Sequence, residues 1–109
     1  MAAKPVRPRA LAQADIDAAA MHYLGEAGAG LALAFVDSVE RAFSQLGAHP
    51  GSGAGRYAHA LDLPGLRFWP LRRFPYLIFY VERADHVDVW RVLHASRDVP
   101  AWLRAPDSK

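Results

Sequence analysis

Cysteine is absent from this chain of 109 residues. Its absence excludes a disulfide framework, a thiolate nucleophile and a cysteine-ligated zinc site, so any metal would need histidines and carboxylates. The histidines outside the expected strands show no ligand-like spacing with carboxylates; they are His22, His49, His59 and His86. The sequence therefore predicts no metal site, and it predicts a fold that packing stabilises.

Long apolar runs are also missing. No run of 18 apolar residues occurs, and the basic, proline-containing residues 1–11 lack the apolar stretch of a secretory signal. We therefore expect neither a membrane span nor secretion, and we expect a cytosolic protein. The length and the 52% hydrophobic content suit one globular domain over residues 1–109, with frayed ends at 1–3 and 104–109.

Nucleotide-binding patterns are absent as well. Residues 49–60 hold three glycines, but they contain neither a P-loop pattern nor GxGxxG, and they do not lie between an expected strand and helix. We predict a connecting loop there and no cofactor.

Charge is nearly balanced in total, with 13 Lys and Arg against 11 Asp and Glu, but it is unevenly distributed. Every base in residues 56–97 is an arginine, and these seven arginines face only four acidic residues. The planar guanidinium suits bidentate contacts to carboxylate or phosphate, so this segment indicates an acidic partner. Solvated ion pairs on strand edges are the alternative interpretation.

The first half of the chain predicts a short edge strand and two helices. Two prolines restrict residues 3–11 to an edge strand or an extended arm. Apolar residues then recur at helical spacing over 12–27 and over 31–46, and the glycines between them permit a tight reversal. We expect an antiparallel helical hairpin whose second helix ends at Gly47.

The second half predicts three strands at residues 66–71, 76–83 and 87–94, with a hairpin link at 84–86. Residues 76–81 are apolar at both parities, so this strand is expected at the centre of the sheet. Strict alternation in the last strand would place Val92 with Trp90 on one face and Leu93 with Val89 on the other.

The expected fold class is therefore α+β. It comprises an N-terminal edge strand, an antiparallel helical hairpin packed on one face of a small antiparallel β-sheet meander, and a short C-terminal helix. Asp98 is the expected N-cap of that last helix.

The last third of the chain carries the most specific motifs. An aromatic strand ends at Phe79-Tyr80, the closing strand reads Arg91-Val92-Leu93-His94, and the pair Arg97-Asp98 opens the final helix. This pattern resembles the RelE/ParE superfamily of toxins from type II toxin–antitoxin systems, and within it the ParE branch. The resemblance covers residues 10–103, with a looser match in the helical part through Asp15-Ile16 and Tyr23.

The resemblance implies a small toxin that a cognate antitoxin neutralises as a hetero-oligomer, wrapping across its helices and sheet. Toxins of the ParE branch are described as poisons of DNA gyrase, whereas RelE-like relatives cut mRNA on the ribosome. These two branches share a fold without sharing a chemistry, so residues must decide between them.

Cleavage of RNA needs a base, an acid and cations that stabilise charge on the phosphate oxygens. In a ribonuclease, the candidates are His94, the one strand histidine placed to titrate near neutral pH, and Arg91 and Arg73 as cations. RelE-like enzymes carry further lysine, tyrosine or histidine residues near the end of the chain, where this sequence has no tyrosine or histidine after His94. We therefore predict a gyrase inhibitor without enzymatic activity or direct nucleic-acid binding; the alternative is a ribosome-dependent mRNA endoribonuclease.

The expected partner-binding residues are basic or aromatic, and we place them on the open face of the sheet and at the C-terminal turn. They are Arg67, Trp69, Arg72, Arg73, Arg91 and Arg97. Structural roles remain open for some of these positions: a core position for Trp69, a cap and local ion pair for Arg97-Asp98, and a ring hydrogen bond at the strand end for His94.

Overall fold

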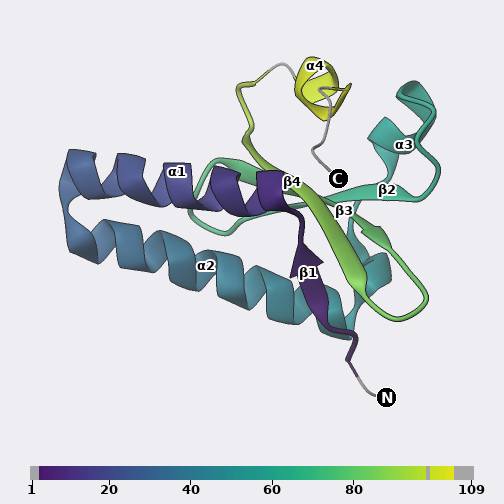
Figure 1. The fold of residues 1–109 in the computed structure, drawn as a ribbon, viewed down its shortest axis with the longest axis horizontal. Helices are drawn as coiled ribbons and strands as arrows, with labels where there is room; N and C mark the ends of the chain where they lie inside the picture. The colour runs from purple at the N-terminus through teal and green to yellow at the C-terminus, as the bar shows by residue number, and fades with distance from the viewer. Residues whose placement is uncertain (1–2, 98, 105–109) are drawn as a thin grey trace.

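The computed structural model describes residues 3–97 and 99–104. Apart from two short helices within residues 50–60, its strands and helices follow the predicted order (Figure 1), and the α+β fold class is confirmed. The elements are β1 (Val6–Pro8), α1 (Ala10–Ala27), α2 (Ala29–Ala48), η1 (Pro50–Ser52), α3 (Arg56–Ala60), β2 (Leu66–Pro70), β3 (Tyr76–Glu82), β4 (Val87–His94) and α4 (Val99–Arg104). The predicted N-cap at Asp98 lies outside the described residues.

The sheet has the strand order β1-β4-β3-β2. β2, β3 and β4 form the predicted antiparallel meander, and β3 lies inside the sheet as its two apolar faces indicate. β1 pairs with β4 in parallel, so the whole sheet is mixed rather than antiparallel. No tight hairpin constrains this pair, because the helices and two strands separate β1 from β4 along the chain.

α1 and α2 lie side by side and antiparallel, joined only by Gly28 (Figure 1). Gly28 has a φ of 91°, a left-handed conformation that glycine adopts without steric cost. None of the described helices is long and apolar enough to cross a membrane.

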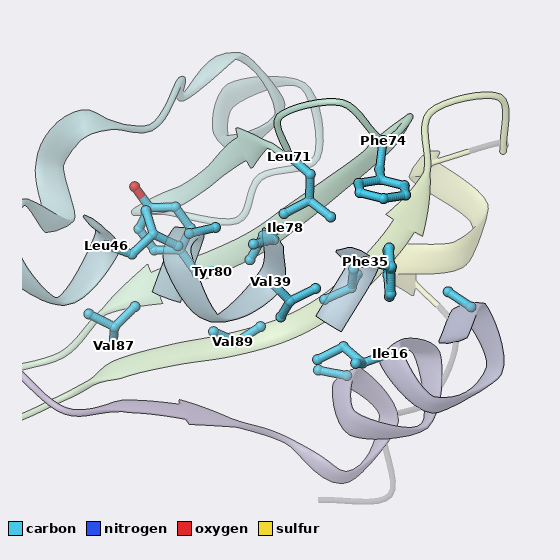
Figure 2. Close-up of a cluster of buried hydrophobic side chains, with 14 residues drawn as sticks. Ile16, Phe35, Val39, Leu46, Leu71, Phe74, Ile78, Tyr80, Val87 and Val89 are labelled. Carbon is cyan, nitrogen blue, oxygen red and sulfur yellow. The ribbon is translucent and has the colours of Figure 1, made fainter. Parts of the chain in front are cut away.

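The main core lies between this helical hairpin and one face of the sheet (Figure 2). Phe35, Val39 and Leu46 from α2 meet Ile78 and Tyr80 from β3, all five almost fully buried. Burial of side chains of this size stabilises a fold by about 1.5–3 kcal/mol each.

A second, smaller core covers the other face of the sheet. Leu66, Phe79 and Leu93 pack there with Val99 of α4 and Tyr57 of α3. The prediction of helical cover on one face only is therefore incomplete, and it is wrong for residues 49–60, which contain η1 and α3 rather than a plain loop.

Tyr80 ties the glycine-rich segment to the sheet. Its hydroxyl donates to the Pro50 carbonyl oxygen at 2.7 Å and accepts the Gly53 N–H at 2.9 Å. The Arg67 guanidinium donates to the Gly53 carbonyl oxygen at 2.8 Å. A Cβ at Gly53 would collide with the Tyr80 hydroxyl and the Phe68 carbonyl oxygen, so this position requires glycine.

A β-bulge breaks the predicted alternation of β4. Phe79 pairs with Arg91 and Tyr80 pairs with Val89, which leaves Trp90 as an extra residue. As a result Val92 joins Val89 in the main core, whereas the prediction placed these two residues on opposite faces.

Asp15 of α1 holds the edge of β4 that β1 does not cover. β1 pairs with β4 only from Val87 to Val89. Beyond it, the Asp15 carboxylate accepts the Val92 N–H at 3.0 Å and the Nε and Nη2 donors of Arg91 at 2.8 Å each. The side chains of Arg91 and Asp15 are only 8% and 14% exposed, so water screens this ion pair poorly.

Asp88 forms a second ion cluster at the start of β4. It accepts hydrogen bonds from Arg9 at 3.0 Å, Arg83 at 3.0 Å and the Trp90 indole at 3.1 Å. Burial alone would raise the pKa of Asp88, but the hydrogen bonds from Arg9, Trp90 and Arg83 outweigh it and hold the pKa below its ordinary value.

Replacing Asp15 is expected to destabilise the fold strongly. Asp15→Asn leaves the buried Arg91 guanidinium without its counter-charge, which should lower the free energy of unfolding by about 3 kcal/mol. Urea unfolding followed by circular dichroism measures this loss. Asp17→Asn, at an exposed position of the same helix, is the matched control, and an equal loss in the two variants would contradict this role of Asp15.

The contribution of Asp88 to stability should depend on pH. Because its pKa is lowered in the folded state, this contribution is present above the unfolded value of about 3.9 and is lost as the pH falls through the lower folded value. Asp88→Asn should therefore destabilise the protein at pH 6, and the difference from wild type should shrink at pH values below about 4. Urea unfolding at several pH values tests this; a difference that does not change with pH would contradict it.

Candidate partner-binding surfaces

The turn between β2 and β3 directs two arginines outward. Leu71 and Phe74 are buried in the main core (Figure 2), whereas Arg72 and Arg73 between them are exposed. Arg73 has a φ of 72°, a left-handed conformation that is uncommon for a non-glycine residue. The Leu71 N–H donates to the Tyr76 carbonyl oxygen at 2.9 Å and closes the turn.

A groove of about 430 Å³ runs between this turn and α2. We call it the arginine groove and define it by Asp37, Ser38 and Arg41 of α2 together with Trp69, Arg72 and Arg73. The Ser38 hydroxyl donates to the Arg72 carbonyl oxygen at 3.1 Å and so fastens the turn to the helix.

The donors of the arginine groove differ in whether they are paired. Arg41 forms an ion pair with Asp37 at 3.1 Å, one helical turn away. In the part of the chain that the structure describes, the Arg72 and Arg73 side chains have no acidic partner, and the half-buried Trp69 indole N–H has no acceptor. The groove thus presents unpaired cationic and polar donors beside an aromatic ring.

A second hollow, also of about 430 Å³, lies between α1 and the end of β4. We call it the histidine hollow and define it by His22, Tyr76, His94, Ser96 and Arg97.

His94 is held in one tautomer. Its Nδ1 accepts the Ser96 N–H at 3.1 Å and lies 2.7 Å from the Ser96 hydroxyl, so the ring proton of the neutral form is on Nε2. The ring packs edge-on against Tyr76, with 5.1 Å between centroids. Burial raises the pKa of Tyr76, and Tyr23 acts in the same direction while Arg97 opposes it. The Tyr76 hydroxyl therefore stays protonated at neutral pH.

The structure separates the six predicted partner-binding residues. Trp69, Arg72 and Arg73 meet in the arginine groove, and Arg97 lines the histidine hollow. Arg91 is buried against Asp15, so its expected place on an open face is wrong. Arg67 is half-buried and bonds to the Gly53 carbonyl, which gives it a structural role in the glycine-rich segment.

The open face of the sheet is not where the basic residues gather. α3 and α4 cover part of that face, and the arginine groove opens beside α2, on the side of the helical hairpin. Sequence analysis missed Asp37, Ser38 and Arg41, because polar residues off an apolar helical stripe are read as an ordinary solvated face.

The three residues considered for a ribonuclease do not form one constellation. Arg73 lines the arginine groove, His94 lines the histidine hollow, and Arg91 is held by Asp15. Among the described residues no group of three histidine, aspartate or glutamate side chains could hold a metal ion.

Comparison with known proteins identifies one matching family. A sequence model described as the ParE toxin of the type II toxin–antitoxin system parDE matches residues 6–99. None of the curated proteins compared with this chain matches it.

Among solved structures, a chain described as the chromosomal ParDE TA system from P. aeruginosa is similar, with a TM-score of 0.70 and 25% sequence identity. The alignment covers 84% of this chain and 95% of that chain. With the family model matching most of its length and the same fold in a solved relative, the chain belongs to the ParE toxin family of type II toxin–antitoxin systems.

Proposed function

We propose that the protein inhibits DNA gyrase by protein–protein binding in the cytosol and that a cognate antitoxin neutralises it in a hetero-oligomeric complex. Membership of the ParE toxin family supports a type II toxin. The similar chain belongs to a structure described as a ParDE toxin–antitoxin system, which supports a protein antitoxin as the partner.

One observation carries the choice of binding over catalysis: the three nuclease candidates lie in separate places. Phosphodiester cleavage needs its base, acid and cations around one phosphate. Here Arg73 and His94 line different hollows, and the Arg91 guanidinium is engaged by the Asp15 carboxylate at 2.8 Å.

The exposed arginines fit recognition of an acidic protein surface. Arg72, Arg73 and Arg97 are exposed, and a guanidinium binds carboxylates with two parallel hydrogen bonds. Such groups raise the rate of encounter with an acidic partner and select its orientation. We assign partner contacts to these three arginines and to Trp69.

The alternative, an mRNA endoribonuclease, rests on the histidine hollow. His94 there has its ring proton on Nε2, and Tyr76 and Arg97 line the same hollow. Among the residues that the structure describes, Asp15 is the one carboxylate lining the hollow. It already accepts from Arg91 and the Val92 N–H, so it makes a poor general base.

The proposal predicts that purified toxin at micromolar concentration inhibits supercoiling of relaxed plasmid by gyrase, and that added antitoxin restores it. The physical reason is that the toxin occupies a surface of gyrase. Inhibition should therefore rise with toxin concentration, and no RNA should be cleaved. Toxin premixed with antitoxin is the matched control.

The alternative function is tested by following mRNA cleavage in a translation extract. Absence of gyrase inhibition, together with cleavage of ribosome-bound mRNA that His94→Ala abolishes, would overturn the proposal in favour of the endoribonuclease.

A further inference from the structure

The arginine groove follows α2 over about three helical turns. Its helical wall runs from Ala34 to Gln45, which spans about 16 Å along α2 at 1.5 Å per residue. Ala34 and Ala42 on this wall are small, so the backbone of an occupant can come close to the helix. A wall of this length matches about three turns of a helix or about five residues of an extended strand.

The charge of the groove selects an acidic occupant. Asp37 balances Arg41 through their 3.1 Å ion pair, so Arg72 and Arg73 leave an excess of two positive charges at the turn. Trp69 lies beside them, half-buried, with an indole N–H that has no acceptor within the described ranges. Carboxylates would accept hydrogen bonds from the two guanidinium groups and from the indole N–H, and an apolar side chain between them would pack on the indole ring.

The backbone that carries the two arginines is fixed in advance. Phe74 packs in the core, with ring centroids 5.4 Å from Phe35 and 5.2 Å from Tyr23, and the Ser38 hydroxyl holds the Arg72 carbonyl. Arg73 adopts a left-handed conformation, which has a steric cost for a non-glycine residue. Little order remains to be gained at the backbone when a partner binds, which favours affinity.

The neighbouring sheet edge offers no route through backbone pairing. The Phe68 N–H and carbonyl oxygen both bond to Ala54, the Leu66 N–H bonds to the Leu63 carbonyl oxygen, and Pro70 has no N–H. β2 therefore has no free outward N–H for an added strand. We therefore expect side chains, rather than an added strand, to recognise a partner at this side of the molecule.

We infer that the arginine groove is the docking site for an acidic segment of the antitoxin, with carboxylates paired to Arg72 and Arg73 and an apolar side chain on Trp69. This inference rests on the proposed toxin–antitoxin function. It does not depend on which enzyme the toxin inhibits, because it concerns binding of the antitoxin alone.

The test measures the affinity of the toxin for the full-length antitoxin encoded beside it, by calorimetry at low and high salt. Arg72→Ala and Arg73→Gly should each weaken binding about 10-fold, and the double charge reversal Arg72→Glu with Arg73→Glu about 100-fold or more. Added salt should weaken wild-type binding more than binding by the double variant.

Two matched variants keep the result interpretable. Arg7→Glu with Arg56→Glu makes the same change in net charge at exposed positions outside the groove, and its affinity should stay within about 3-fold of wild type. Arg73→Gly removes the guanidinium while relieving the left-handed φ, so its melting temperature should not fall and a loss of binding cannot reflect unfolding.

Wild-type affinity in the charge-reversal variant would overturn the docking site, and so would equal losses in that variant and in the control pair. Failure of the proposed function has a different signature: wild-type toxin that binds the antitoxin but does not inhibit gyrase refutes the target and leaves the docking site in place. A wild-type toxin that does not bind the antitoxin refutes both.

Discussion

Asp15 reaches from α1 to the stretch of β4 that β1 leaves uncovered, where it takes the Arg91 guanidinium and the Val92 N–H together. This contact fixes α1 against the sheet, and the single-residue link at Gly28 then fixes α2 beside α1. With α2 in place, Phe35 meets Phe74, and the turn that carries Arg72 and Arg73 is held beside the helix. The position of the arginine groove thus depends on a carboxylate on the neighbouring helix.

The arginines of the chain divide into internal and external groups. Arg91 donates to the Asp15 carboxylate and Arg67 donates to the Gly53 carbonyl oxygen, so both stabilise the fold. Leu71 and Phe74 occupy core positions on either side of Arg72 and Arg73, so these two arginines point outward. They have no such partner among the described residues. An arginine-rich sequence therefore yields a small, localised basic surface instead of a broad one.

Sequence periodicity was sufficient to predict the helical hairpin, the meander and the central place of β3, since each depends on apolar residues at regular spacing. It could not predict that Arg91 points inward, because Asp15 lies 76 residues away and no local pattern reports that contact. Nor could it predict the bulge at Trp90, which moves Val92 to the opposite face of the sheet, because the bulge depends on how β4 pairs with β3. Periodicity assigns no role to Asp37 and Arg41, since polar residues off an apolar helical stripe indicate solvated surface, and only the turn opposite makes them part of a groove.

Antitoxin binding at the turn from Leu71 to Phe74 and the facing side of α2 is measured most directly by hydrogen exchange of the toxin alone and in complex with its antitoxin, residue by residue. We expect slower exchange at the amides of residues 71–74 in the complex, with unchanged exchange at the β3–β4 hairpin, residues 83–86. Protection confined to the histidine hollow, at residues 94–97, with none at the turn would contradict it.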